Sequence, residues 1–147
     1  MTRRATHTWK RLLAIVAAFL AGAVMQSPAQ TPDELAVKLA RRVVQRAPLS
    51  VAGREMVQVE TEIPAGVESG WHVHPGEEVG YIIAGRIEMK VQGRATVVLK
   101  AGEGFLIPPN TPHNARDLGP ETGRMLSTYL VEPGRPLSTT VDQPVRN

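Results

Sequence analysis

The chain has 147 residues, 42% hydrophobic and 21% charged, a composition typical of one globular domain rather than of a disordered or collagen-like protein. It has no cysteine, which excludes a disulfide framework, a thiolate metal site and a thiol nucleophile. Its net charge of +3 comes from residues 1–29, because residues 30–147 hold thirteen basic and fourteen acidic side chains; with only 4% aromatic residues, this argues against nucleic acid as a partner.

Residues 1–29 have the order of features of a secretion signal. Four basic residues within the first eleven precede an apolar run at 12–25, and small residues follow at Ser27 and Ala29. We therefore predict cleavage after Ala29 and a periplasmic or secreted mature protein. The apolar run is 14 residues long. Since a helix needs roughly 20 apolar residues to cross a bilayer, we expect no permanent membrane anchor.

Residues 30–48 predict a short amphipathic helix. The sequence Thr-Pro-Asp-Glu at 31–34 is typical of a capped helix start, with proline in the first turn. Leu35, Leu39 and Val43 recur at every fourth position and form one apolar face. Three arginines, at 41, 42 and 46, lie near the expected C-terminal end, where cations suit the helix dipole. Pro48 is expected to end the helix.

From residue 49 the apolar residues follow a period of two, which predicts strands. Apolar and polar side chains alternate over residues 57–63 and again over 86–91, as they do in strands with one wet face. Turn signals containing glycine or proline separate these strands from three more, at 96–99, 105–107 and 125–131. We expect an all-β sandwich or small barrel over residues 49–132. Residues 133–147 form a tail without periodicity, which either wraps the barrel or pairs with a neighbouring chain.

The three histidines outside the predicted signal lie in one region of the predicted barrel. His72 and His74 are two residues apart, so a strand would place both imidazoles on one face. A turn after His74 is expected to reverse the chain like a hairpin and bring Glu78 beside them, and His113 follows a later turn. Three imidazoles and one carboxylate can bind a first-row transition metal and leave positions open for water or substrate. Glu77 is the alternative carboxylate, but strand parity turns it to the opposite face.

These residues resemble the two motifs of the cupin superfamily. Residues 66–85 read G-x5-H-x-H-x3-E-x6-G, which is the family's first motif at every fixed position. Residues 102–117 resemble the second motif, G-x5-P-x-G-x2-H-x3-N, with Asn110 in place of glycine and Asp117 in place of asparagine. Asn110 tolerates the left-handed backbone that a turn glycine supplies, and an aspartate at 117 can still accept a hydrogen bond. The resemblance implies a double-stranded β-helix, also called a jelly roll or cupin barrel, of six to eight strands.

The resemblance also implies a metal site. By family analogy His72, His74, Glu78 and His113 are the ligands of one divalent transition metal, with Fe, Mn, Ni, Cu and Zn all open. The expected partner is a small-molecule ligand or substrate, and many cupins form homodimers through their sheet edges, so a homodimer is expected here by the same analogy.

Strand alternation predicts which residues surround this site. Gly80, Ile82 and Ala115 share the face of the ligands and would make a small apolar pocket. The candidates for its mouth, each of which could equally be ordinary core or rim, are Phe105, Met125, Tyr129 and Trp71. Three arginines, at 54, 86 and 124, could hold an anionic substrate, although a solvated face explains them equally well.

The sequence shows no dedicated general base beyond the four ligands, so the catalytic residues stay unknown. Three functions remain open. One is an oxygenase-type enzyme acting on a small organic molecule, which is our first choice if the protein is an enzyme. The second is a non-catalytic periplasmic module that binds a metal or a small ligand. The third is a lyase or isomerase that uses the metal as a Lewis acid.

Overall fold

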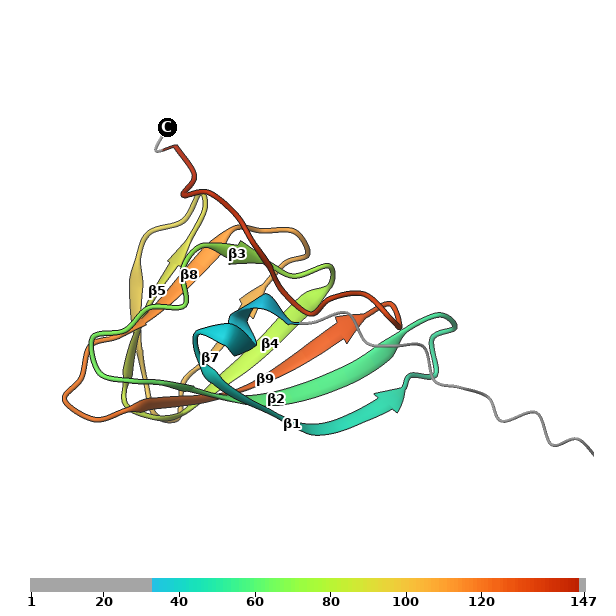
Figure 1. Ribbon diagram of the computed structural model, residues 1–147, viewed down its shortest axis with the longest axis horizontal. Helices are drawn as coiled ribbons and strands as arrows, with labels where there is room; N and C mark the ends of the chain where they lie inside the picture. The colour runs from blue at the N-terminus through green and yellow to red at the C-terminus, as the bar shows by residue number, and fades with distance from the viewer. Residues whose placement is uncertain (1–32, 146–147) are drawn as a thin grey trace, which may run out of the picture.

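The computed structural model describes residues 33–145, where two five-stranded antiparallel sheets face each other (Figure 1). The predicted secretion signal at 1–29 lies outside the described residues. The first sheet contains, in order across the sheet, β1 (Ala40–Pro48), β2 (Glu55–Ile63), β9 (Gly123–Val131), β4 (Glu77–Ala84) and β7 (Gly104–Ile107). The second contains β10 (Thr139–Thr140), β3 (His72–Val73), β8 (His113–Asp117), β5 (Arg86–Val91) and β6 (Val97–Lys100). The expected all-β double-sheet fold is confirmed.

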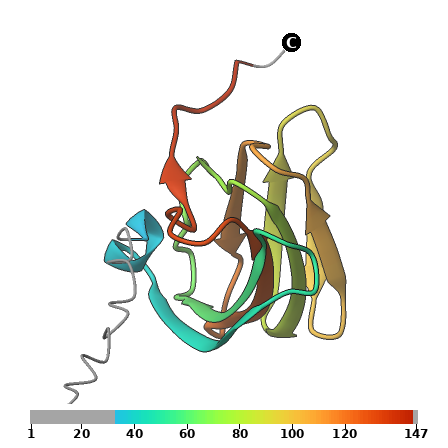
Figure 2. The same cartoon turned by 90° about the vertical axis from the view of Figure 1, so that its right-hand side faces the viewer.

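The side chains on the inward faces of the two sheets form the core, and Figure 2 shows the same strands turned by 90°. Along β2 every second residue is buried, because the side chains of a strand alternate between the two faces of its sheet. The larger apolar cluster consists of Leu39, Ile63, Ile82, Ile87, Met89, Val91, Ile107, Ala115 and Met125. The smaller one consists of Val57, Val59, Tyr129, Val131 and Leu137.

One glycine allows a close contact inside the larger cluster. Gly80 in β4 pairs with Phe105 in β7, and a Cβ added at Gly80 would lie 2.0 Å from the Phe105 ring. Only a residue without a side chain lets the ring lie over β4 in this way. Gly80, Ile82 and Phe105 therefore pack together as part of the core.

The predicted helix over residues 30–48 is wrong. The described part of that segment has one 3₁₀ turn, η1 (Glu34–Val37), which the Asp33 side chain caps, and then strand β1. Strand β1 pairs with β2 over residues 40–48. Strand β2 is therefore paired on both sides, and β1 forms the edge of the first sheet. Hydrogen bonding to β2 and the β-branched Val43 and Val44 outweigh the weak helical pattern. The proposed cap Thr31 lies outside the described residues.

The C-terminal tail wraps the barrel, which was one of the two alternatives. Strand β10 pairs with β3 at the edge of the second sheet, and Leu137 and Ser138 just before it are buried. The N–H and the hydroxyl of Thr140 donate to the Glu34 carboxylate at 2.6 Å, so the tail also contacts η1. Figure 2 shows η1 and β10 side by side. Among residues 33–145 there is no helix with the length and apolar character needed to cross a membrane.

The two departures from the second motif have different outcomes. Asn110 has φ 54°, the left-handed backbone that was expected at this position. Asp117 is fully buried, yet neither of its carboxylate oxygens has a hydrogen-bond partner among the described residues. Its backbone holds the strand end instead, because its N–H donates to Val67 O and its carbonyl accepts from Gly66 N, both at 3.0 Å.

Candidate metal centre

The structure brings His72, His74, Glu78 and His113 together in the interior of the barrel, each between 1 and 3% exposed. His72 in β3 is the register partner of His113 in β8, so these two lie side by side in the second sheet. Glu78 lies in β4 of the first sheet. The expected hairpin between the histidines and Glu78 is therefore wrong, since the carboxylate approaches from the facing sheet. Glu77 is exposed on the outer face of β4.

The separations of the four side chains fit one shared metal ion. The three histidines offer ligand nitrogens that all lie within 4.8 Å of one another. Glu78 Oε2 lies 3.1 Å from His74 Nε2 and 3.2 Å from His113 Nε2. Two ligands about 2.1 Å from one metal, at angles of about 90–110°, are themselves about 3.0–3.4 Å apart. His74 Nε2 and Glu78 Oε2 have no hydrogen-bond partner among the described residues, which suits atoms that bind an ion.

Backbone carbonyls orient all three imidazoles. His72 Nδ1 donates to Gly70 O at 2.8 Å, His74 Nδ1 to Leu137 O at 2.6 Å and His113 Nδ1 to Thr111 O at 2.9 Å. A carbonyl oxygen only accepts, so each contact places the proton on Nδ1 and leaves the lone pair of a neutral ring on Nε2. The residues thus present three nitrogen lone pairs to the interior. The Leu137 carbonyl gives the C-terminal tail a role in the site that the sequence did not reveal.

The electrostatic surroundings favour the charge states that bind metals. Burial and the neighbouring His113 and His74 hold the pKa of His72 well below its ordinary value of 6.5, so the neutral imidazole is favoured. Burial raises the pKa of Glu78, but the interactions of its carboxylate with the neighbouring His74 and His113 outweigh burial and hold this pKa well below 4.5. A neutral imidazole and an ionised carboxylate are the forms that coordinate a divalent ion.

These pKa shifts predict that the metal-free protein is acid-sensitive. Because the folded-state pKa of His72 lies below the unfolded value of 6.5, the unfolded chain takes up its proton first as the pH falls through 6.5. The free energy of unfolding should therefore fall between pH 7 and pH 5, and fall further below 4.5 as the contribution of Glu78 is lost. Urea unfolding at several pH values measures the free energy of unfolding. His72→Gln should flatten its pH dependence between pH 7 and pH 5. A wild-type free energy of unfolding that does not change with pH would contradict the prediction.

Beyond the four predicted ligands, a buried chain of polar groups continues from Glu78. The Tyr129 hydroxyl donates to Glu78 Oε1 at 3.1 Å and accepts from Arg41 Nη2 at 2.8 Å. Arg41 Nη1 lies 2.7 Å from Asp33 Oδ2. Burial and the neighbouring Glu78 raise the pKa of Tyr129, so its hydroxyl stays a neutral donor. Arg41 and Asp33 were missed as site residues because they were assigned to a helix. The adjacent β-branched Val43 and Val44 were the available sign of a strand there, and the burial of Arg41 appears only in the structure.

A cavity of about 20 Å³ lies against these groups, enough for about one water molecule. Of the five predicted pocket residues, Ala115 and Met125 line it. Gly80, Ile82 and Phe105 lie in the core instead. The other lining residues are Leu35, Leu39, Arg41, Thr61, Ile63, Ser69, His72, Glu78, Met89, His113 and Tyr129. The three arginines proposed for an anion, at 54, 86 and 124, do not line it.

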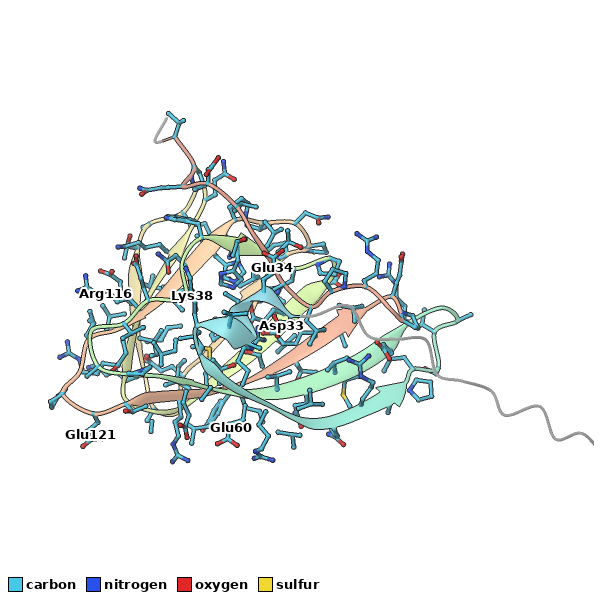
Figure 3. All side chains as sticks on the ribbon, viewed as in Figure 1. Asp33, Glu34, Lys38, Glu60, Arg116 and Glu121 are labelled. Carbon is cyan, nitrogen blue, oxygen red and sulfur yellow. The ribbon has the colours of Figure 1, made fainter. Side chains whose placement is uncertain are left out.

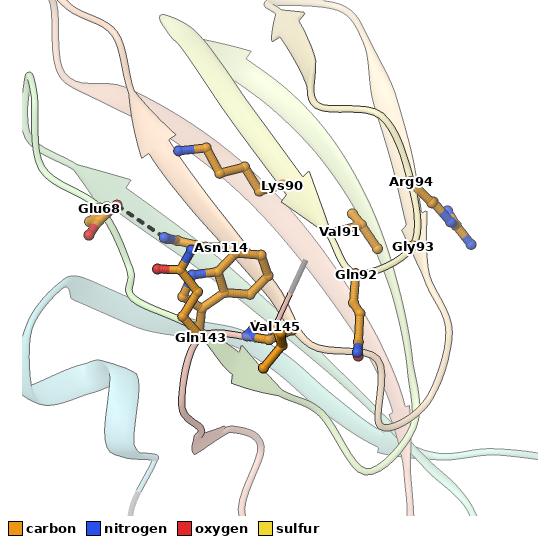
Figure 4. A pocket seen from close by; sticks show the side chains of 11 residues that line it. Glu68, Lys90, Val91, Gln92, Gly93, Arg94, Asn114, Gln143 and Val145 are labelled. Carbon is orange, nitrogen blue, oxygen red and sulfur yellow. Dashed lines mark hydrogen bonds between the residues drawn. The ribbon is translucent and has the colours of Figure 1, made fainter. Parts of the chain in front are cut away.

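A second and larger pocket, of about 700 Å³, lies apart from the ligands (Figure 4). Trp71, expected near the mouth of the metal site, lines this groove with Lys90 and Arg94. Lys90 and Asn114 are register partners on the face opposite to His113, so the groove lies outside the barrel. Asn114 donates to Glu68 at 3.0 Å there. None of the four predicted ligands lines the groove.

Comparison of the sequence with known proteins gives one family match. The family model described as "Cupin domain" matches residues 59–129, which include all four predicted ligands. A segment of 56 residues is 39% identical to the polyketide synthase CurC of Streptomyces cyaneus. That match covers 37% of this chain and 36% of CurC, so this chain matches little more than a third of its curated relative.

Solved structures with a similar fold also match this chain. A protein with a double-stranded β-helix domain from Klebsiella pneumoniae aligns with a TM-score of 0.58 and 25% identity, over 78% of this chain and 91% of that one. The lyase DddQ of Ruegeria pomeroyi, which acts on DMSP, aligns with a TM-score of 0.53 and 24% identity, over 58% of this chain and 42% of that one. At these identities the likeness shows a shared fold.

Proposed function

This chain belongs to the cupin superfamily, and on that premise we propose that it binds one divalent transition metal through His72, His74, Glu78 and His113 and acts there on a small organic molecule. The observation that carries the proposal is the set of three Nδ1–H contacts to backbone carbonyls. They direct three Nε2 lone pairs to the place that the Glu78 carboxylate also reaches. Burying these nitrogen lone pairs and the Glu78 carboxylate lowers the stability of the fold unless an ion binds them.

The residues of this chain prepare the site in three ways. A metal held there would supply Lewis acidity or a redox-active centre. The carbonyls fix the imidazole rings before an ion binds, which reduces the cost of ordering the ligands. Tyr129 holds Glu78 Oε1 and leaves Oε2 directed at the histidines. The two sheets bury these side chains away from bulk water, so charges in the site interact more strongly than they would in water.

An oxygenase-type reaction is our first choice if the protein is an enzyme. Apart from the proposed ligands, Arg41 and Tyr129 are the titratable groups among the described residues that line the cavity. Arg41 stays protonated and the pKa of Tyr129 is raised, so neither is a good general base. A lyase or isomerase reaction that removes a proton from carbon needs such a base, whereas oxidation at a redox metal does not. This favours the oxygenase type.

A non-catalytic binding module is the second candidate. The observation in its favour is the size of the cavity, about 20 Å³, which leaves little room for a substrate in this conformation. A module that stores or senses a metal needs no more space. For either function, we also predict that residues 1–29 direct export and that the protein forms a homodimer.

Elemental analysis of the purified full-length protein, followed by aerobic and anaerobic screening of small metabolites, tests these functions. We expect about one equivalent of a transition metal per chain and turnover that consumes oxygen. Turnover that is insensitive to oxygen would support a lyase or isomerase instead. Firm metal retention without turnover would support the binding module. A protein that binds no transition metal at any ratio would contradict the proposal.

A further inference from the structure

We propose that Arg41 binds a carboxylate of the ligand, so that this site selects small organic acids over neutral molecules of the same shape. The inference rests on the proposed function and deepens it, because it names the class of ligand for the same cavity. Arg41 lies outside residues 59–129, the part that matches the cupin family, so the family match does not assign it a role.

The position of Arg41 is unusual for an arginine on an edge strand. It belongs to β1, whose neighbouring arginines at 42 and 46 are exposed, yet its own side chain is only 2% exposed. Arg41 lines the cavity that Glu78, His72 and His113 also line. Arginine is seldom buried without a specific partner, because desolvating its charge is costly. A cation beside a metal site is suited to holding a negatively charged ligand near that metal.

The donors of Arg41 are only partly used. Nη2 donates to the Tyr129 hydroxyl at 2.8 Å, and Nη1 contacts the Asp33 carboxylate at 2.7 and 3.0 Å. The third nitrogen, Nε, is buried and has no hydrogen-bond partner among residues 33–145. The guanidinium is planar and binds carboxylates through pairs of parallel N–H groups. The unused Nε–H is therefore one donor that a carboxylate oxygen of the ligand can take up.

The charge on Arg41 is secure. Burial alone would lower its pKa, but Tyr129, Asp33 and Glu78 outweigh burial and raise the pKa above its ordinary value. The Tyr129 hydroxyl accepts a hydrogen bond from Arg41 and donates one to Glu78. Arg41 and the proposed metal ligands therefore belong to one hydrogen-bonded network. A ligand carboxylate that contacts both Arg41 and the metal would form hydrogen bonds similar to those that it displaces in this network.

Asp33 now holds the place of such a carboxylate. It lies beside η1 (Figure 3). The same segment contributes buried Leu35 and Leu39 to the cavity wall. The cavity admits about one water molecule, so a larger ligand requires part of the wall to move, and we infer that the N-terminal segment is the part that moves. Such movement separates Asp33 from Arg41 and leaves a buried cation without its anion. A ligand carboxylate compensates that charge, whereas a neutral ligand does not.

Binding of matched acids and amides tests the inference. Isothermal titration would compare acetate, propionate and lactate with acetamide, propionamide and lactamide, using metal-loaded and metal-free protein. We expect at least one acid to bind the wild type about 10-fold more tightly than its amide. Arg41→Gln should abolish that preference and retain the metal. Arg42→Gln is the matched control, because Arg42 follows Arg41 on β1 but is exposed and pairs with Glu60.

Asp33→Asn separates this role from a purely structural one. If Asp33 competes with the ligand for Arg41, its neutralisation should tighten acid binding about threefold or more. If Arg41 only anchors the N-terminal segment, the same change should leave the affinity for the acids unchanged. This variant also keeps the test decisive if Arg41→Gln fails to fold.

Two results would overturn the inference: equal binding of every acid and its amide by the wild type, or a preference for acids that survives Arg41→Gln. Failure of the proposed metal function has a different signature. In that case no protein retains a transition metal, while the metal-free wild type still prefers the acid and Arg41→Gln does not.

Discussion

Replacing His113 or His72 by alanine should lower the affinity for the metal at least about 100-fold. Each change deletes one imidazole that the structure directs at the proposed metal position. Even the loss of a group that only orients a ligand typically costs about 10–100-fold in metal affinity, so the loss of a ligand itself should cost at least the upper value. Competition with a chromophoric chelator and elemental analysis of the purified variants would measure the change.

Glu77→Ala is the control for these variants. Glu77 is adjacent to Glu78 in β4 but is exposed on the outer face of the first sheet. Removing its carboxylate leaves the four proposed ligands in place, so metal occupancy should stay that of the wild type. Equal occupancy in His72→Ala, His113→Ala and Glu77→Ala would rule out our ligand assignment. Far-ultraviolet circular dichroism would show that all three variants remain folded.

Alternation along the chain predicted several of the strands, and the motif spacing together with the cupin resemblance predicted that the four side chains would meet. Alternation over 57–63 and 86–91 placed the buried residues on the correct faces, because a strand has only two faces. Parity also separated Glu78 from Glu77. Strand alternation could not predict that Glu78 approaches the histidines from the facing sheet. A hairpin and a crossing between two sheets start from the same short turn, and only the packing of the whole barrel distinguishes them.

The N-terminal segment shows where local patterns were misleading. Residues 31–34 resemble a helix cap, and the structure does use Asp33 as the cap of a single 3₁₀ turn. The helix does not continue because β2 would otherwise be an unpaired edge, and pairing with β1 satisfies its backbone groups. The wrong element also concealed the inward position of Arg41, a member of the buried polar network beside the candidate site. On the predicted helix Arg41 was one of three cations near the C-terminal end, whereas in the structure its side chain is buried, two residues after buried Leu39.

Ile82→Ala should lower the free energy of unfolding by about 2–5 kcal/mol, which is roughly 10 °C or more in the melting temperature of a domain of this size. Ile82 is 0% exposed and packs within the larger apolar cluster between the sheets. Truncating it removes buried methyl groups and leaves a cavity that the surrounding strands cannot fill. Because Ile82 does not line the metal cavity, metal affinity measured on folded protein should be unchanged.

Ile83→Ala provides a control of the same residue type in the same strand. Ile83 follows Ile82 in β4 and points to the outer face, where it is 36% exposed. Its truncation should cost less than about 1 kcal/mol, because the methyl groups it loses are already partly in contact with water. Thermal and urea unfolding of the two variants would measure the difference. Similar losses for both would contradict the assignment of Ile82 to the core, and a selective change in metal or ligand affinity in Ile82→Ala would instead place it on the wall of the site.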